Sequence, residues 1–158
     1  MINNLKDIRS ANELDEFEDE ICKAIRKGLT NIDSVAKASY NKIRKPVDLY
    51  IEHIVSLSKE MNPYRKNLIE FLFIPLDSQI IGSPYIFTDY EIQRHGLRRN
   101  STFKDITNKS TYQILQDTLI SKTFTMPGVK RIYFDLLWND RYKMWGNNLF
   151  ETNLSIKA

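Results

Sequence analysis

A dense group of cationic and aromatic residues lies between positions 85 and 109, and these residue types bind phosphates and bases. Residues 94–109 carry five cations and one anion, so their local charge is +4. The cations are Arg94, Arg98, Arg99, Lys104 and Lys109, and the aromatic residues nearby are Tyr85, Phe87, Tyr90 and Phe103. Because aromatic rings stack on unpaired bases while cations contact phosphates, one interpretation of this pattern is binding of single-stranded RNA.

The same segment has the element order of a DNA-binding motif. Residues 88–91 (Thr-Asp-Tyr-Glu) have the spacing of a capping box, and Gly96 lies where that helix should stop. Asn100 or Ser101 would then cap a second helical turn that ends near Ile106. Over residues 88–106 this arrangement resembles a DNA-binding helix-turn-helix. The resemblance implies that Asn100, Ser101 and Thr102 face bases, and that Arg94, Arg98, Arg99 and Lys104 hold the phosphate backbone.

Catalysis has weaker support in the sequence. His95 lies among the arginines, and a base beside cations is the requirement of a metal-independent RNase, which is our third hypothesis. A histidine at this place is also typical of a helix cap or a surface residue. Asp135 and Asp140 lack a following acidic-x-lysine pattern, and residues 18–20, which precede Lys23, are better explained as a solvated helix face. We therefore expect a binding protein rather than an enzyme, with no metal and no cofactor.

A second candidate surface for binding is the aromatic block at residues 132–148. Both tryptophans lie in it, and Arg141 is one helical turn from Trp145. Such density is typical of a buried core element, but Trp and Arg also dominate protein interfaces. The alternative function is therefore a protein-interaction module, such as an inhibitor, immunity protein or antitoxin. Its candidate contact residues are Trp138, Arg141 and Trp145.

The N-terminal elements that support these segments are predicted as two helices. Ser10 and Glu13 form a capping box, and an apolar stripe then runs to Gly28. From residue 36 to residue 61, apolar residues recur at alternating steps of four and three. They are Ala36, Tyr40, Ile43, Val47, Tyr50, Ile54, Leu57 and Met61. This seam favours an antiparallel hairpin with the first helix, or a contact with a second chain, and Pro46 predicts a kink or a restart within it.

For several of the remaining segments the sequence fits more than one type of secondary structure. Asn62-Pro63 has the form of a helix start, and residues 68–74 fit either a buried helix end or a central strand. Residues 78–87 suggest a short hairpin or an extended loop. A third capping box at residues 110–113 opens a helix, and residues 126–128 break the chain. The stretch that follows fits either a strand over 129–134 or a helix reaching residue 145.

Composition limits the fold class and the compartment. The chain has 158 residues with only 10 Gly and Pro together, which argues against a turn-rich β sandwich. We expect one mainly α domain over 1–158, in which a long helical hairpin (1–62) packs on a compact region of short helices (63–158) with at most a small β element. Cys22, the single cysteine, is expected to be a buried and inert thiol. No long apolar run is present, so we expect a cytoplasmic protein without a membrane partner.

Charge is unevenly distributed along the chain. Residues 1–20 hold two cations and seven anions, a net −5, so the remaining residues sum to +8 against the total of +3. The acidic head is either a solvated helix face or a cover over the basic surface. The leading hypothesis is a nucleic-acid-binding protein of a regulatory or genetic-conflict (defence) system, with DNA or RNA as its partner; a protein partner or a homodimer is the alternative.

Overall fold

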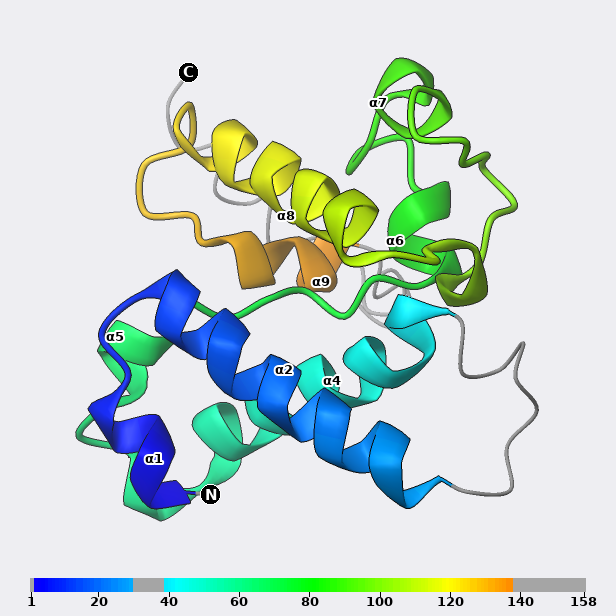
Figure 1. Ribbon diagram of the computed structural model, residues 1–158. Coiled ribbons are helices and arrows are strands. Elements are labelled where there is room, and N and C mark those ends of the chain that lie inside the picture. Colours follow the sequence, from blue (N-terminus) through cyan, green and yellow to red (C-terminus); the bar gives the residue numbers. More distant parts are fainter. Residues whose placement is uncertain (1, 30–38, 138–158) are drawn as a thin grey trace.

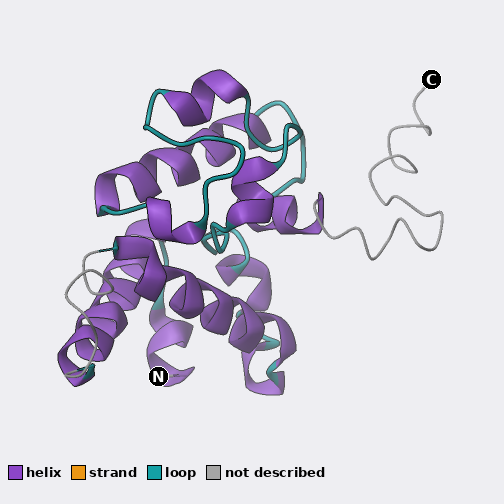
Figure 2. Ribbon diagram, turned by 90° about the vertical axis from the view of Figure 1, so that its right-hand side faces the viewer, coloured by secondary structure: helices purple, strands orange, loops and turns teal. Residues whose placement is uncertain are grey.

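Helices and turns make up the two parts of the chain that the computed structural model describes, residues 2–29 and 39–137 (Figure 1). The α-helices are α1 (Ile2–Asp7), α2 (Ala11–Gly28), α4 (Tyr40–Leu57), α5 (Arg65–Leu68), α6 (Ser78–Gly82), α7 (Asp89–Gln93), α8 (Lys109–Thr123) and α9 (Phe134–Leu137). Short 3-10 helices occur at η1 (Lys59–Met61), η2 (Phe103–Asp105) and η3 (Arg131–Tyr133). No strand occurs in the described ranges (Figure 2), so the predicted mainly α fold is confirmed and its optional β element is not formed there.

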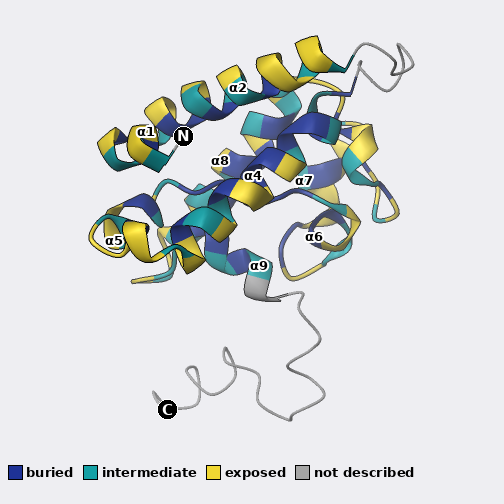
Figure 3. Cartoon of the chain, turned by 90° about the horizontal axis from the view of Figure 1, so that it is seen from below, coloured by how far each residue is buried: buried dark blue, intermediate teal, exposed yellow. Residues whose placement is uncertain are grey.

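The predicted N-terminal hairpin is formed by α2 and α4, which pack side by side and run in opposite directions (Figure 1). Ser10 accepts a hydrogen bond from the Glu13 amide, as the capping box predicted, while the Glu13 carboxylate accepts from the amide of Arg9. The helix ends at Gly28. Exposed residues follow the outward face of α2 in Figure 3, whereas Leu14 and Cys22 turn inward.

The buried face of α4 departs from the predicted heptad seam. The helix continues through Pro46 without a restart, and its core residues are Ile43, Val47, Ile51 and Val55, each four positions apart. Successive residues of an α-helix are about 100° apart, so each step of four moves the buried face by about 40° around the helix. Leu57 comes two residues after Val55, on nearly the opposite side of the helix, and is 76% exposed.

The middle of the chain forms neither the predicted hairpin nor a strand. Asn62 has a helical backbone conformation and is the C-cap of η1 rather than the N-cap of a new helix, and α5 begins only at Arg65. Residues 72–76 are buried but have no strand partner, because they run between helices rather than beside another extended segment. Asp77 accepts hydrogen bonds from the amides of Gln79 and Ile80 and so starts α6, where the sequence suggested a hairpin.

The last described elements pack on this core. Helix α8 is capped by Asn108 instead of Ser110, but its predicted inner face of Tyr112, Leu115 and Leu119 is fully buried. The predicted break at residues 126–128 is present, since Gly128 has φ +81°. Helical turns follow in η3 and α9, so the strand predicted as one option over 129–134 is wrong. Among the described residues, no helix combines the length and the apolarity that crossing a bilayer requires.

Candidate functional site

Segment 88–106 begins as the sequence predicted. Thr88 and Glu91 form a reciprocal capping box at the start of α7. Gly96 adopts φ +74°, a conformation that side-chain-bearing residues rarely take, and it turns the chain after the helix. The Arg98 amide donates to the Ser101 hydroxyl at 2.9 Å, and the Ser101 amide donates back to the Arg98 carbonyl at 2.9 Å. The loop after α7 is thus a fixed turn.

The second half of the segment does not form a recognition helix, so the predicted helix-turn-helix is wrong. The element after the turn is η2, which has three residues and is too short to enter a major groove. Thr102, rather than Asn100 or Ser101, caps it in a reciprocal box with Asp105. Ser101 is buried and Thr102 is occupied by the cap, so only Asn100 of the three predicted base-contacting residues is exposed.

The predicted basic cluster divides into free and paired cations. Arg94, Arg98 and Lys104 are exposed and form no ion pair with any residue in the described part of the chain. Arg99 pairs with Asp89 at 2.6 Å. Lys109 turns away to the carboxylates of α2, as described below. Three of the cations grouped by the sequence are therefore available to an external phosphate.

Exposed aromatic rings occur along the same segment as these free cations. Tyr85 is 83% exposed and Tyr90 is 72% exposed, and the Arg94 guanidinium lies 5.5 Å from the centre of the Tyr90 ring. Two ammonium groups lie over the half-buried Phe103 ring, Lys45 at 5.2 Å and Lys104 at 5.8 Å. We call the set Tyr85, Tyr90, Arg94, Arg98, Phe103 and Lys104 the basic–aromatic surface. Phe87, in contrast, is fully buried in the core.

A cleft of about 410 Å³ adjoins this surface at the C-terminal end of α7. Its lining includes the backbone turn at Gly96 together with Arg98 and Arg99. The Arg99 Nη1 atom is buried and has no hydrogen-bond partner among the described residues. His95, half-buried nearby, has no hydrogen bond or ion pair from its ring to any described side chain, so no carboxylate orients it as a catalytic base would need.

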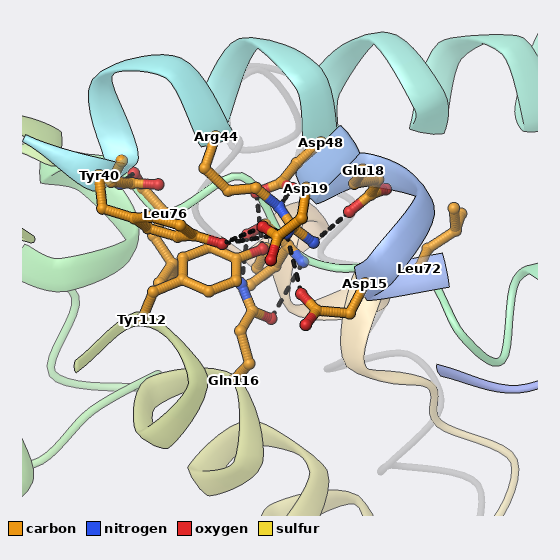
Figure 4. Close-up of polar contacts among 12 residues, drawn as sticks. Asp15, Glu18, Asp19, Tyr40, Arg44, Asp48, Leu72, Leu76, Tyr112 and Gln116 are labelled. Atoms are coloured by element: carbon orange, nitrogen blue, oxygen red, sulfur yellow. Dashed lines mark hydrogen bonds and ion pairs between the residues drawn. The ribbon is translucent and has the colours of Figure 1, made fainter. Parts of the chain in front are cut away.

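The most concentrated group of charges in the described residues is buried between α2, α4 and α8, where no sequence pattern predicted it. The guanidinium of Arg44 is fully buried at its centre (Figure 4). It contacts four carboxylates: Asp15 at 2.9 Å, Asp19 at 3.1 Å, Asp48 at 2.6 Å, and Glu18. We call these five residues, with Tyr40, Lys109 and Tyr112, the Arg44 cluster.

Hydroxyl and ammonium groups complete the Arg44 cluster. Tyr112 donates to Asp48 at 2.8 Å, and Tyr40 donates to Asp19 at 2.8 Å. The Lys109 ammonium bridges Asp15, at 2.7 Å, and Asp19. Because a buried charge without a partner is strongly destabilising, this cluster requires three helices to be in place at once. The Arg44 cluster is therefore a structural joint, by which we mean a buried charge network that holds α2, α4 and α8 together.

Burial favours the protonated form of two carboxyls in the cluster. Burial raises the pKa of Glu18 well above its ordinary value, and burial also raises the pKa of Asp48 to about 6, although Arg44 opposes both shifts. Asp48 accepts from Arg44 and Tyr112, whereas the Glu18 Oε1 atom has no donor among the described residues. We assign the proton to Glu18, which then donates it to the neighbouring Asp48.

Neither metal binding nor thiol chemistry fits the Arg44 cluster. A guanidinium occupies its centre, and the described residues contain no group of three or more metal-ligating side chains. Cys22 is buried beside it, and burial raises the pKa of this thiol to about 12, as suits the inert residue that we expected.

Comparison of the sequence with protein families and curated proteins, and of the fold with solved structures, finds no match. Trp138, Arg141 and Trp145, the predicted interaction residues, lie outside the described part of the chain.

Sequence reasoning missed the Arg44 cluster because acids on a helix are usually solvated. That rule favours an exposed face for Glu18 and Asp19, but both contact Arg44, whereas Glu20 is exposed and pairs with Lys23. A usable signal existed. Glu18 lies four residues from both Leu14 and Cys22, so it falls inside the apolar stripe of the helix.

Proposed function

We propose that this protein binds single-stranded nucleic acid through the basic–aromatic surface. The observation that carries the proposal is the alternation of free cations with exposed or half-buried rings along one segment, in which Arg94 lies over exposed Tyr90 and Lys104 over half-buried Phe103. Stacking on aromatic rings requires unpaired bases, while cations beside the rings neutralise the phosphates that connect those bases. The single turn of η2 offers no element for reading duplex DNA.

The acidic head does not compete for this surface. Asp15, Glu18 and Asp19 are bound to Arg44 inside the protein, so α2 is a core element rather than a displaceable cover over the arginines. Binding should therefore need no release of the N-terminus, and deletion of residues 1–20 should unfold the protein rather than raise its affinity.

Fluorescence anisotropy with a labelled single strand tests the proposal. A strand of about 20 nucleotides exceeds the usual site size, and a duplex of the same sequence serves as competitor. Replacing Arg98 and Lys104 together by Gln should weaken binding and reduce the slope of log affinity against log salt by about 1.4, because each lost phosphate contact on a single strand removes about 0.7. Tyr90→Ala should weaken binding by about 1–3 kcal/mol through lost stacking.

A charge-matched control comes from lysines elsewhere on the surface. Lys27 and Lys66 are both exposed and belong to α2 and α5, helices that lie away from α7 (Figure 1), so their joint replacement by Gln should leave affinity and salt slope almost unchanged. If both double variants lost the same affinity, the effect would come from net charge alone and not from this surface. Binding that favours the duplex, or that Tyr90→Ala leaves intact, would contradict the stacking mechanism.

A further inference from the structure

The solvent face of α4 carries no charged side chain between residues 46 and 57. Leu57 is 76%, Tyr50 52% and Leu49 39% exposed; Pro46, which precedes them, and His53 and Ser56, which lie among them, are exposed as well. Of the two acids in this range, Asp48 is buried in the Arg44 cluster and Glu52 is half-buried. We call Pro46, Leu49, Tyr50, His53 and Leu57 the α4 stripe.

A stripe of this kind is unusual for a helix face in water. The outward face of α2 has the ordinary composition, with Glu13, Glu16, Glu20 and Lys23 exposed. The solvent face of α4 instead carries a proline, two leucines and two ring side chains. They span residues 46 to 57, which is about 16 Å of helix. Contiguous apolar surface that the fold leaves uncovered is typical of an interaction site.

We propose that the α4 stripe is the contact of a homodimer in which α4 pairs with α4 of a second copy in antiparallel orientation. The stripe is nearly symmetric about a point between residues 51 and 52. A two-fold axis there places Leu57 against the second copy's Pro46, and Tyr50 against the second copy's His53. The same patch thus fits itself, as the contact of a two-fold dimer requires.

The charges at the two ends of α4 favour a second copy of the chain as the partner, and they favour the antiparallel orientation. Lys42 makes the N-terminal end basic, since the neighbouring Lys45 is paired with Asp77, whereas Lys59 and Glu60 make the other end neutral. A parallel pair would bring the basic ends of both copies together. The antiparallel pair separates them and brings each Lys42 near the second copy's Glu60, since residues 42 and 60 are almost equidistant from the two-fold axis. The stripe between these ends is uncharged, so a second copy can pack against it without further pairs of opposite charges.

Analytical ultracentrifugation of the full chain tests the pairing. A single helix pair buries less than about 1,200 Å² in total, so the dimer should be weak and should form as concentration rises into the micromolar range. Leu57→Asp should raise its dissociation constant by about tenfold or more without affecting folding, because the side chain already faces water. Phe124→Asp is the matched control: that residue is 80% exposed at the end of α8, and its replacement should not change the dimer. Lys42→Glu should weaken the dimer, and adding Glu60→Lys should restore it.

Oxidative cross-linking distinguishes the orientation. In the antiparallel pair the thiol of His53→Cys lies close to its symmetry mate, whereas that of Leu57→Cys is about 16 Å from its mate along the axis. Only the first variant should form a covalent dimer readily, and buried Cys22 should not interfere. A wild-type protein that stays monomeric at high concentration would refute the proposal, and so would a dimer that Leu57→Asp does not disturb. Equally ready cross-linking of the Leu57→Cys and His53→Cys variants would refute the antiparallel arrangement.

Discussion

Acid should stabilise this protein between pH 6 and pH 4.5, because the Arg44 cluster keeps a proton that the unfolded chain has released. The pKa of Asp48 is raised from 3.8 to about 6 by burial, and that of its partner Glu18 is raised well above 4.5 for the same reason. A carboxyl with a raised pKa in the folded state stabilises the fold fully below its unfolded pKa. This stabilisation is lost as pH rises through the folded pKa.

The size of the effect follows from the number of protons. One additional proton in the folded state changes the free energy of unfolding by about 1.4 kcal/mol per pH unit. Burial gives Asp48 a pKa of about 6, so the coupled Glu18–Asp48 pair gives up a proton near that pH, and stability should fall by about 2 kcal/mol between pH 4.5 and 6. Burial also raises the pKa of Glu52 to about 7, but this residue is partly solvated, so it extends the decline toward neutral pH with a smaller slope.

Stability should also fall at strongly acidic pH. Burial alone would raise the pKa of Asp19, but hydrogen bonds from Lys109 and Tyr40 outweigh it and lower that pKa. A lowered pKa stabilises the fold above the unfolded value of 3.8, and that contribution is lost as the pH falls further. The stability maximum should therefore lie between about pH 4 and pH 5.

Urea denaturation followed by circular dichroism at several pH values measures these changes. Glu18→Gln imitates the protonated carboxyl: its amide oxygen can accept from Arg44 while its NH₂ donates to Asp48. This variant should match the wild type near pH 4.5 and lose most of the decline above it. Glu16→Gln, at an exposed position of the same helix, should keep the wild-type slope. Stability that rises from pH 4.5 to 6 in the wild type, or an unchanged slope in Glu18→Gln, would refute the proton assignment.

Two further substitutions test the packing by the same denaturation assay. Arg44→Met should cost about 3–5 kcal/mol at pH 8, because it leaves buried carboxylates without their cation, and less at pH 5, where those groups take up protons; an equal cost at both pH values would contradict this account. Gly82→Ala should cost about 1–3 kcal/mol despite the better helix propensity of alanine, since the added Cβ would lie 2.9 Å from the backbone carbonyl of Arg99. Gly28→Ala has open space around its Cβ and should be neutral or stabilising, and the reverse order of the two glycine variants would refute the packing argument.

Local signals in the sequence predicted helix starts well where a side chain caps its own backbone. Ser10 and Thr88 cap α2 and α7 as expected, because an N-cap needs only residues within one turn. The start of α6 was missed although Asp77 is a good cap, since the apolar residues on both sides also fit a hairpin. Local propensity does not distinguish a helix from a hairpin here. The helix is favoured by tertiary packing, which buries Ile80 and Ile81 in the core.

Long-range pairing was beyond the sequence. Arg44 and Asp48 lie four residues apart within an apolar stripe, but the other carboxylate partners of Arg44 are 25 to 29 positions away on α2. Tyr112, which donates to Asp48, is 64 positions away on α8. A charge on an amphipathic helix has the same local pattern whether it faces water or a buried counter-ion. The cluster of cations at 94–109 shows the converse. Its local charge of +4 includes Lys109, which the fold turns toward Asp19.

Burial of the acids makes the outer surface more basic than the total charge indicates. The Arg44 cluster contains four carboxylates and two cations, a net −2 when all are ionised, so the rest of the chain carries +5 rather than the overall +3. The acids that the sequence places beside the N-terminus therefore do not screen Arg94, Arg98 and Lys104 from a phosphate ligand. If Arg44→Met unfolded the protein at neutral pH, nucleic-acid affinity would fall together with stability. Glu18→Gln, which keeps every pairing in the cluster, should leave that affinity unchanged. Comparing the two variants thus separates the structural joint from the binding surface.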